Sequence, residues 1–317
     1  MLAPLVMLRA FVLCSLVLAA PLLGACDQDD AEGESTLDAC SNGRDDDDDD
    51  LVDCDDPACR AYVFCLSSDA GADAGPVDAA PLPDGAICVR PIDVVLSVDV
   101  SSSMGPTLAA LRDASSALIE RLQALDPSAR VSLVVFVDDA LAVEECAPLD
   151  VSALQDQLEL WRVRSEDNRS PVSETYNTDC PENSLDALML ATRGCPWRAG
   201  AARLLVHVTD DTFAERPTVL SGPFGGGIVV QSTYAEVGEA MEDASVRMIA
   251  LTRTGTGESC GAGRSPDVGQ GFHTPYRDAV ALPERTGGAA LLLPDFAAGN
   301  LDLVGVIADQ AQLACEP

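Results

Sequence analysis

Residues 91–104, PIDVVLSVDVSSSM, join an apolar segment to a loop of oxygen-bearing side chains. The apolar half predicts a buried strand, and a helix is expected to begin near Gly105. Between the two lie Asp99, Ser101 and Ser103, at the carboxyl end of the strand, where open α/β sheets bind ligands. One carboxylate and two hydroxyls at this spacing can converge on a hard cation such as Mg²⁺. The stretch therefore predicts an α/β domain with a cation site.

Strand-like and helix-like patterns alternate through the C-terminal two thirds of the chain. Strands are expected at 93–98, 131–137, 141–145, 203–209, 246–252 and 289–293. Helices are expected at 107–125, 151–161, 184–193, 234–243 and 301–313. This alternation predicts a mostly parallel sheet that is covered by helices on both faces.

The 317-residue chain is strongly acidic, with 52 Asp and Glu against 19 basic residues and a formal net charge of -33. That excess argues against nucleic acid and anionic lipid headgroups as partners, and it favours cations. All 19 basic residues are arginine, so the chain has no lysine for a nucleotide-binding GxxxxGK loop, and no nucleotide is expected. Twelve cysteines without a CxxC pair indicate an oxidising compartment.

The first 25 residues have the pattern of a secretory signal, because Arg9 precedes an apolar run that is too short for a membrane span. The run ends in LGAC, which is similar to the lipobox of bacterial lipoproteins, with Cys26 as the lipidated residue. This resemblance implies a lipid-anchored protein of the bacterial cell envelope. The alternative is an ordinary signal that is cleaved near the same place. Without Cys14 and Cys26 the chain keeps an even number of cysteines, which favours the lipid anchor.

Composition divides the rest of the chain into four parts. They are an acidic tether (26–39), a Cys/Asp-rich module (40–65), an Ala/Asp/Pro/Gly linker (66–87) and the α/β domain (88–317). Within the module, six positions match the ligand spacing of an EF-hand-like Ca²⁺ loop: Asp45, Asp47, Asp49, the backbone of Leu51, Asp53 and Asp56. Asp50 replaces the turn glycine, however, and a run of six Asp matches many spacings by chance. A calcium loop and a solvated acidic spacer both stay open.

Three motifs follow one another in the α/β domain. They are Asp99, Ser101 and Ser103; then Asn177, Asp179, Pro181 and Glu182 before a helix; then Asp210 at the end of a hydrophobic strand. Together they resemble the motifs of von Willebrand factor A (vWA) domains with a metal-ion-dependent adhesion site, and the pattern is most similar to the A-like domain of integrin β subunits. The resemblance implies a Rossmann-like vWA fold with a six-stranded sheet.

The same resemblance implies the ligands of two cations. Ser101, Ser103 and Glu182 would bind Mg²⁺ or Mn²⁺ directly, Asp99 and Asp210 would hold its waters, and Thr178 is the alternative ligand to Glu182. A second site, with Ca²⁺ as the candidate ion, would consist of Asp138, Asn177, Asp179, the carbonyl of Pro181 and Glu182. A third cation site of the relatives does not carry over, because Pro106 and Thr107 stand where its carboxylates would be.

The predicted function is divalent-cation-dependent protein binding, in which the metal captures an acidic residue of a protein partner. A calcium-dependent structural or sensing surface protein is the alternative, and a metal-assisted hydrolase is the less favoured one. We do not expect an enzyme, because the chain has no HExxH helix and no paired catalytic carboxylates at a plausible spacing. Of its two histidines, His207 falls inside a predicted core strand and is expected to be packed rather than catalytic.

The order of the expected elements also predicts disulfide pairs. Cys88 precedes the first strand and Cys315 follows the last helix, so both belong at the amino-terminal edge of the sheet and are expected to pair. By the same topology, Cys146 is expected to pair with Cys195, and Cys180 with Cys260.

Overall fold

The computed structural model describes residues 43–45, 51, 52, 55, 59, 88–178, 180–220, 227–255 and 267–315. The predicted signal segment, Cys26, the tether and the linker lie outside these residues. Of the six positions of the predicted calcium loop, Asp45 and Leu51 are described and the other four are not. The lipid anchor, the calcium loop and the domain boundaries thus stay predictions, and the description below concerns the α/β domain.

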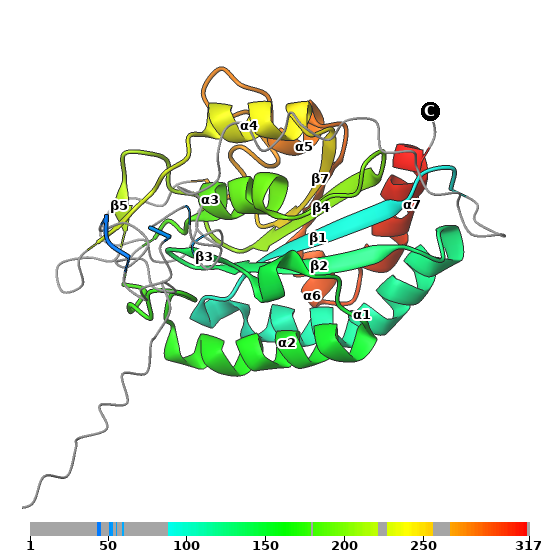
Figure 1. The fold of residues 1–317 in the computed structure, drawn as a ribbon, viewed down its shortest axis with the longest axis horizontal. Coiled ribbons are helices and arrows are strands. Elements are labelled where there is room, and N and C mark those ends of the chain that lie inside the picture. Colours follow the sequence, from blue (N-terminus) through cyan, green and yellow to red (C-terminus); the bar gives the residue numbers. More distant parts are fainter. Residues whose placement is uncertain are drawn as a thin grey trace, which may run out of the picture. The chain divides into compact units, whose positions relative to one another are not determined.

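A six-stranded sheet forms the centre of the domain and confirms the predicted fold class (Figure 1). Its strands are β1 (Ile92–Asp99), β2 (Arg130–Phe136), β3 (Ala140–Ala142), β4 (Ala202–Thr209), β7 (Val246–Thr252) and β8 (Ala289–Leu292). Their order is β3-β2-β1-β4-β7-β8, and every pair is parallel except β2 with β3. This Rossmann-type order reverses between β1 and β4, which is where such sheets bind ligands.

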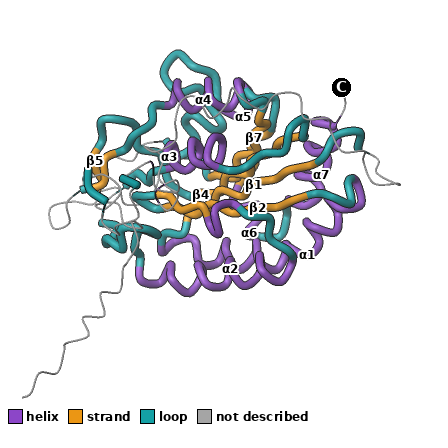
Figure 2. The backbone as a smooth tube through the Cα atoms, viewed as in Figure 1, coloured by secondary structure: helices purple, strands orange, loops and turns teal. Residues whose placement is uncertain are grey.

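Helices cover both faces of the sheet, as Figure 2 shows. One face packs against α1 (Gly105–Leu125), α2 (Val151–Arg164), α6 (Leu293–Ala297) and α7 (Leu303–Cys315), and the other against α3 (Ser184–Met189), α4 (Tyr234–Asp243) and α5 (Leu282–Arg285). Because side chains alternate along a strand, β1 sends Val94 and Leu96 to the first core and Val95 to the second. In the described part of the chain, no helix is both long and apolar enough to span a bilayer.

The structure differs from the predicted elements at a few places. The strand expected at 141–145 ends at Ala142, because Glu144, Glu145 and Cys146 adopt positive φ angles of 49°, 56° and 58°. Positive φ breaks the extended backbone that pairing requires. The helix expected at 184–193 is α-helical to Met189 and continues as a π-helical turn. The short helices α5 and α6 and the two-residue strands β5 (Val219–Leu220) and β6 (Ile228–Val229) are too short to leave a periodic pattern.

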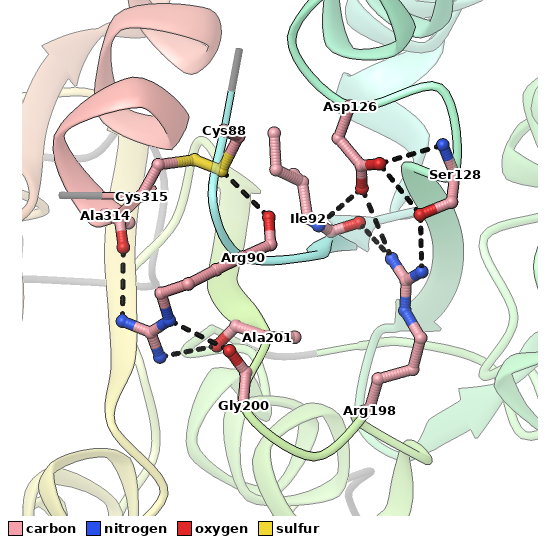
Figure 3. Close-up of a disulfide and its surroundings, with 10 residues drawn as sticks. All are labelled: Cys88, Arg90, Ile92, Asp126, Ser128, Arg198, Gly200, Ala201, Ala314 and Cys315. Atoms are coloured by element: carbon pink, nitrogen blue, oxygen red, sulfur yellow. Dashed lines mark hydrogen bonds and ion pairs between the residues drawn. A yellow bond between two sulfur atoms is a disulfide. The ribbon is translucent and has the colours of Figure 1, made fainter. Parts of the chain in front are cut away.

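Two of the predicted disulfides are present. The Cys88–Cys315 disulfide joins the segment before β1 to the end of α7, and the two Cα atoms are 5.3 Å apart (Figure 3). Cys146 pairs with Cys195. The third predicted pair involves Cys260, which lies outside the described residues.

A buried ion-pair network lies beside the Cys88–Cys315 disulfide (Figure 3). Arg198, in the loop before β4, donates from Nε to Asp93 Oδ1 at 2.7 Å and from Nη2 to the Ile92 carbonyl at 2.7 Å. Asp126, which is fully buried at the end of α1, accepts from the Ile92 and Ser128 backbone amides. These bonds fasten the start of β1 to the segments that precede β2 and β4.

Candidate metal centre

The residues predicted to bind the first cation come from three chain segments that meet at the carboxyl ends of β1 and β4. Asp99 ends β1, and Ser101 and Ser103 lie in the turn that leads into α1. Asp210 directly follows β4. Glu182 precedes α3, and its backbone amide donates to the Thr212 carbonyl at 2.9 Å, which fixes it beside the segment after β4.

The two serine hydroxyls lie side by side. Ser101 Oγ is 3.2 Å from Ser103 Oγ, and Ser103 Oγ donates to Asp210 Oδ1 at 2.9 Å. Two oxygens that bind one Mg²⁺ at right angles, each at about 2.0–2.1 Å, are about 3 Å apart. The spacing of the hydroxyls therefore fits shared ligation of one ion. Ser101 is buried whereas Ser103 is exposed, so the pair is open to solvent on one side.

The Asp99 carboxylate is fully buried and is held by two bonds. Its Oδ1 accepts from the Ser101 amide at 2.8 Å, and its Oδ2 accepts from Thr209 Oγ1 at 2.7 Å. Burial, together with the nearby charge of Asp210, raises the pKa of Asp99 to about 7. A nearby cation would favour the ionised form that this environment disfavours.

Glu182 is the most informative residue of the site. Its side chain is 2% exposed, and its Oε1 accepts from Asn177 Nδ2 at 2.8 Å. Its Oε2 is buried and has no hydrogen-bond partner among the described residues. Burial and then the charges of Asp99, Asp138 and Asp211 raise the pKa of Glu182 well above its usual range. An unpartnered buried carboxylate oxygen costs free energy unless a cation or a donor meets it, so this atom fits a metal ligand.

Part of the predicted second cation site is also assembled. Asn177 contacts Glu182, and Asp138, which is fully buried, is close enough to raise the pKa of Glu182 by charge repulsion. Pro181 is half-buried beside Glu182, and Asp179 lies outside the described residues. Thr178, the alternative ligand of the first site, is exposed.

Two residues that orient the site are not evident in the sequence. Thr209 holds Asp99 from the neighbouring strand, and its position directly before Asp210 is the signal that could have found it. Asn168 accepts from the Ser102 amide at 2.9 Å and donates to the Asn177 carbonyl at 3.0 Å, so it joins the first and second motifs. Its φ of 50° is one that Asn tolerates better than most residues, but nothing in the local sequence predicts the two contacts.

Within the described residues, no three side chains of His, Cys, Asp or Glu converge closely enough to enclose a metal on their own. The candidate site does not need such a group, because hydroxyls, water and carboxylates can share the ligation of a hard cation. The chemistry that this donor set supports is therefore the binding of Mg²⁺ or a similar ion, not of a soft metal.

His207 is packed in the core, as predicted. It is fully buried, its ring stacks on Phe136 with 5.2 Å between ring centroids, and its Nδ1 is 3.1 Å from Ser97 Oγ. Burial lowers the pKa of His207 to about 3, so the ring is neutral at ordinary pH. It has no access to a substrate.

Comparison with known proteins does not place the chain in a family. No protein-family profile matches the chain. The conserved hypothetical protein BatB from Bacteroides thetaiotaomicron is 17% identical, with a TM-score of 0.41 over 69% of this chain and 98% of that one. An aerotolerance-related membrane protein from Bacteroides fragilis, solved with multiple mutations to serines, is 13% identical, with a TM-score of 0.42 over 69% and 99%. The fold class described here rests on the strand order of this chain itself.

Proposed function

We propose that the domain binds Mg²⁺ or Mn²⁺ through Ser101, Ser103 and Glu182, and that the bound metal captures an acidic residue of a protein partner. Asp99 and Asp210 hold the metal's waters. The observation that carries the proposal is the buried Glu182 Oε2, which lacks a hydrogen-bond partner among the described residues and belongs to the same site as the two adjacent hydroxyls.

The donor set favours capture of an acid by the metal. Hydroxyls are neutral ligands, so the ion keeps more positive charge than it would among carboxylates alone. Ser103 is exposed, which leaves room for a ligand from outside the chain. A second cation, with Ca²⁺ as the candidate, would share the Glu182 carboxylate and offset part of its charge. Its proposed ligands are Asp138, Asn177, Asp179, Pro181 and Glu182.

We further propose that the protein is lipid-anchored in the bacterial cell envelope and acts there as a binding protein and not as an enzyme. Its two described disulfides support an oxidising compartment. The lipobox-like LGAC sequence supports a lipid anchor at Cys26.

The test compares metal-dependent capture by the wild type, Asp99→Ala and Ser103→Ala. Ser102→Ala is the matched control, because Ser102 is also exposed and lies next to Ser103 but is not a proposed ligand. Mg²⁺ binding is measured by calorimetry, and partners are captured from envelope and extracellular fractions with and without chelator. The wild type and Ser102→Ala should bind Mg²⁺ and capture partners only without chelator, whereas the other two variants should do neither. Capture of the same partners under all conditions would show that the proposal is wrong.

A further inference from the structure

A cavity of about 320 Å³ lies at the opposite end of the sheet, where β4 and β7 begin. Four arginines line it: Arg90, Arg203, Arg247 and Arg285. Its remaining wall includes the apolar side chains of Met241 and Leu313 and the hydroxyls of Ser245 and Thr286. The volume is at the lower end of the range of small-molecule sites, which is roughly 300–1,000 Å³.

The charge of this cavity differs from that of the chain around it. Residues 88–317 carry 33 Asp and Glu and 16 Arg, yet four of those 16 arginines line the cavity, with Glu242 as its one acidic lining residue. Glu242 forms an ion pair with Arg285 at 2.5 Å. In the part of the chain that the structure describes, Arg90, Arg203 and Arg247 form no ion pair with a carboxylate.

Two of the arginines, Arg90 and Arg203, lie close enough for their charges to interact. Burial lowers the pKa of Arg203, the charge of Asp93 partly offsets this effect, and the charge of Arg90 makes a smaller further contribution that lowers the pKa. Like charges held together in a partly buried cavity repel, so an anion between them would be stabilised.

The arginines also have a structural role, because three of the four, Arg90, Arg203 and Arg247, donate to backbone carbonyls. Arg90 donates to the Ala314 and Gly200 carbonyls at 3.2 and 2.9 Å (Figure 3), and Arg203 donates to the Ala244 carbonyl at 2.8 Å. The C-terminus of a helix carries roughly half a negative charge, so the ends of α4 and α7 together offset about one of the positive charges. The lining stays positive after this correction. Each guanidinium has five N–H donors, and these carbonyls use only some of them.

We propose that this cavity binds a small oxyanion with two or more negative charges, of the phosphate or polycarboxylate type. Guanidinium groups match both chemistries because their paired N–H groups can bind two oxygens at once. The surplus positive charge of the lining sets the preference for more than one negative charge. The apolar wall of Met241 and Leu313 leaves room for an organic part.

The chain itself contains a second group of anions that could occupy the cavity, since residues 27–56 contain 15 acidic residues and one Arg. A tethered acidic segment has a high effective concentration and could compete for the cavity. The proposal is that a free anion binds, and the test separates the two sources.

The test is calorimetric titration of the full chain with inorganic phosphate, after metal has been removed with a chelator and the chelator has been dialysed away, so that no metal at the other end of the sheet can bind the probe. Arg203→Gln and Arg247→Gln should each weaken binding about tenfold or more, because each removes a charged donor. Arg121→Gln, at an exposed arginine outside the cavity, should leave the affinity unchanged.

A fourth variant keeps every arginine contact. Leu313, which is half exposed, lies in the wall, so Leu313→Glu adds a carboxylate there and should abolish phosphate binding without loss of the fold. Thermal unfolding checks that each variant is folded. Failure of the wild type to bind phosphate saturably, or an equal loss in Arg121→Gln, would overturn the proposal.

A variant with Asn at every position from 45 to 50 distinguishes the sources. It should bind phosphate with the affinity of the wild type. Binding that appears only in this variant would show that the chain's own acidic segment fills the cavity, and the proposal of a free ligand would then be wrong. None of these results depends on the proposed metal centre.

Discussion

Thr209 donates its hydroxyl hydrogen to Asp99 Oδ2 at 2.7 Å, and both side chains are fully buried. The bond crosses from β4 to β1 at the point where the strand order reverses. Because the other oxygen of Asp99 is held by the Ser101 amide, the carboxylate has one orientation before any ion binds. Such prior positioning reduces the cost of assembling a site when its ligand arrives.

Replacing Thr209 with Val keeps the side-chain shape and removes this bond. We expect the free energy of unfolding to fall by about 1–3 kcal/mol, because a buried carboxylate oxygen loses its donor. The affinity for Mg²⁺ should fall as well. Urea unfolding and calorimetry measure the two effects. Thr209→Ser, which keeps the hydroxyl, should retain most of the Mg²⁺ affinity, and equal Mg²⁺ affinities for the wild type and Thr209→Val would contradict the role given to this bond.

Glu182→Gln should separate the stability of the fold from the binding of the metal. In chelator, the variant is expected to be more stable than the wild type by on the order of 1 kcal/mol, since it removes the free-energy cost of burying an ionisable carboxyl beside Asp99 and Asp138. Its Mg²⁺ affinity should drop at least about tenfold, because a charged ligand is lost. Chemical unfolding in chelator and calorimetry with Mg²⁺ check both outcomes. A variant that binds Mg²⁺ as tightly as the wild type would make Thr178 the better candidate ligand.

His207 predicts a pH dependence. The pKa of His207 is about 3 in the folded protein and about 6.5 in the unfolded chain, so the unfolded chain binds a proton more readily. Its contribution to stability is complete above pH 6.5 and is lost as the pH falls towards 3, by at most about 1.4 kcal/mol per pH unit. His207→Gln removes this contribution.

The raised pKa values of Asp99 and Glu182 act in the opposite direction over the same pH range. The measurement is therefore the difference in unfolding free energy between the wild type and His207→Gln, followed from pH 8 to pH 4 by urea titration. As the pH falls, the unfolding free energy of the wild type should decrease relative to that of His207→Gln. A difference that does not vary with pH would mean that His207 is not buried as a neutral ring.

The Cys88–Cys315 disulfide should be a major source of stability. It joins cysteines 227 positions apart, so it restricts the unfolded chain strongly, and Cys88→Ser with Cys315→Ser is expected to lower the unfolding free energy by about 2–5 kcal/mol. Cys146→Ser with Cys195→Ser spans 49 positions and should cost less by the same argument. Urea unfolding without reductant compares the two double variants. Mg²⁺ affinity should be unchanged in the first, because its disulfide lies at the far end of the sheet.

The sheet could be predicted from the sequence because its strands are continuous apolar runs that end in polar residues. The run before Asp99 and the run before Asp210 both have this form, and the structure confirms the strands they predict. The end of β3 could not be predicted in the same way. Glu144 and Glu145 have left-handed backbone angles that non-glycine residues rarely adopt, and tertiary contacts such as the disulfide of the next residue, Cys146, are not visible in local sequence.

The candidate site, too, could be predicted from the sequence only in part. Asp99, Ser101 and Ser103 are two positions apart, so their spacing alone carries the signal. The contact between Ser102 and Asn168 spans 66 positions and joins a backbone amide to a side chain, which leaves no pattern in either segment. The binding of a metal by these residues stays a prediction.

The network of Arg198, Asp93 and Asp126 has a mechanical consequence. If the chain is anchored through its N-terminal segment and a partner is held at the carboxyl end of β1, a pulling force enters at Cys88 and leaves beyond Asp99, along the axis of β1. That strand is paired on both sides, with β2 and with β4, so the force would shear two ladders of hydrogen bonds at once instead of unzipping one. The disulfide and the ion pairs lie where the force enters, and they would pass it to α7 and β4 before β1 could slide.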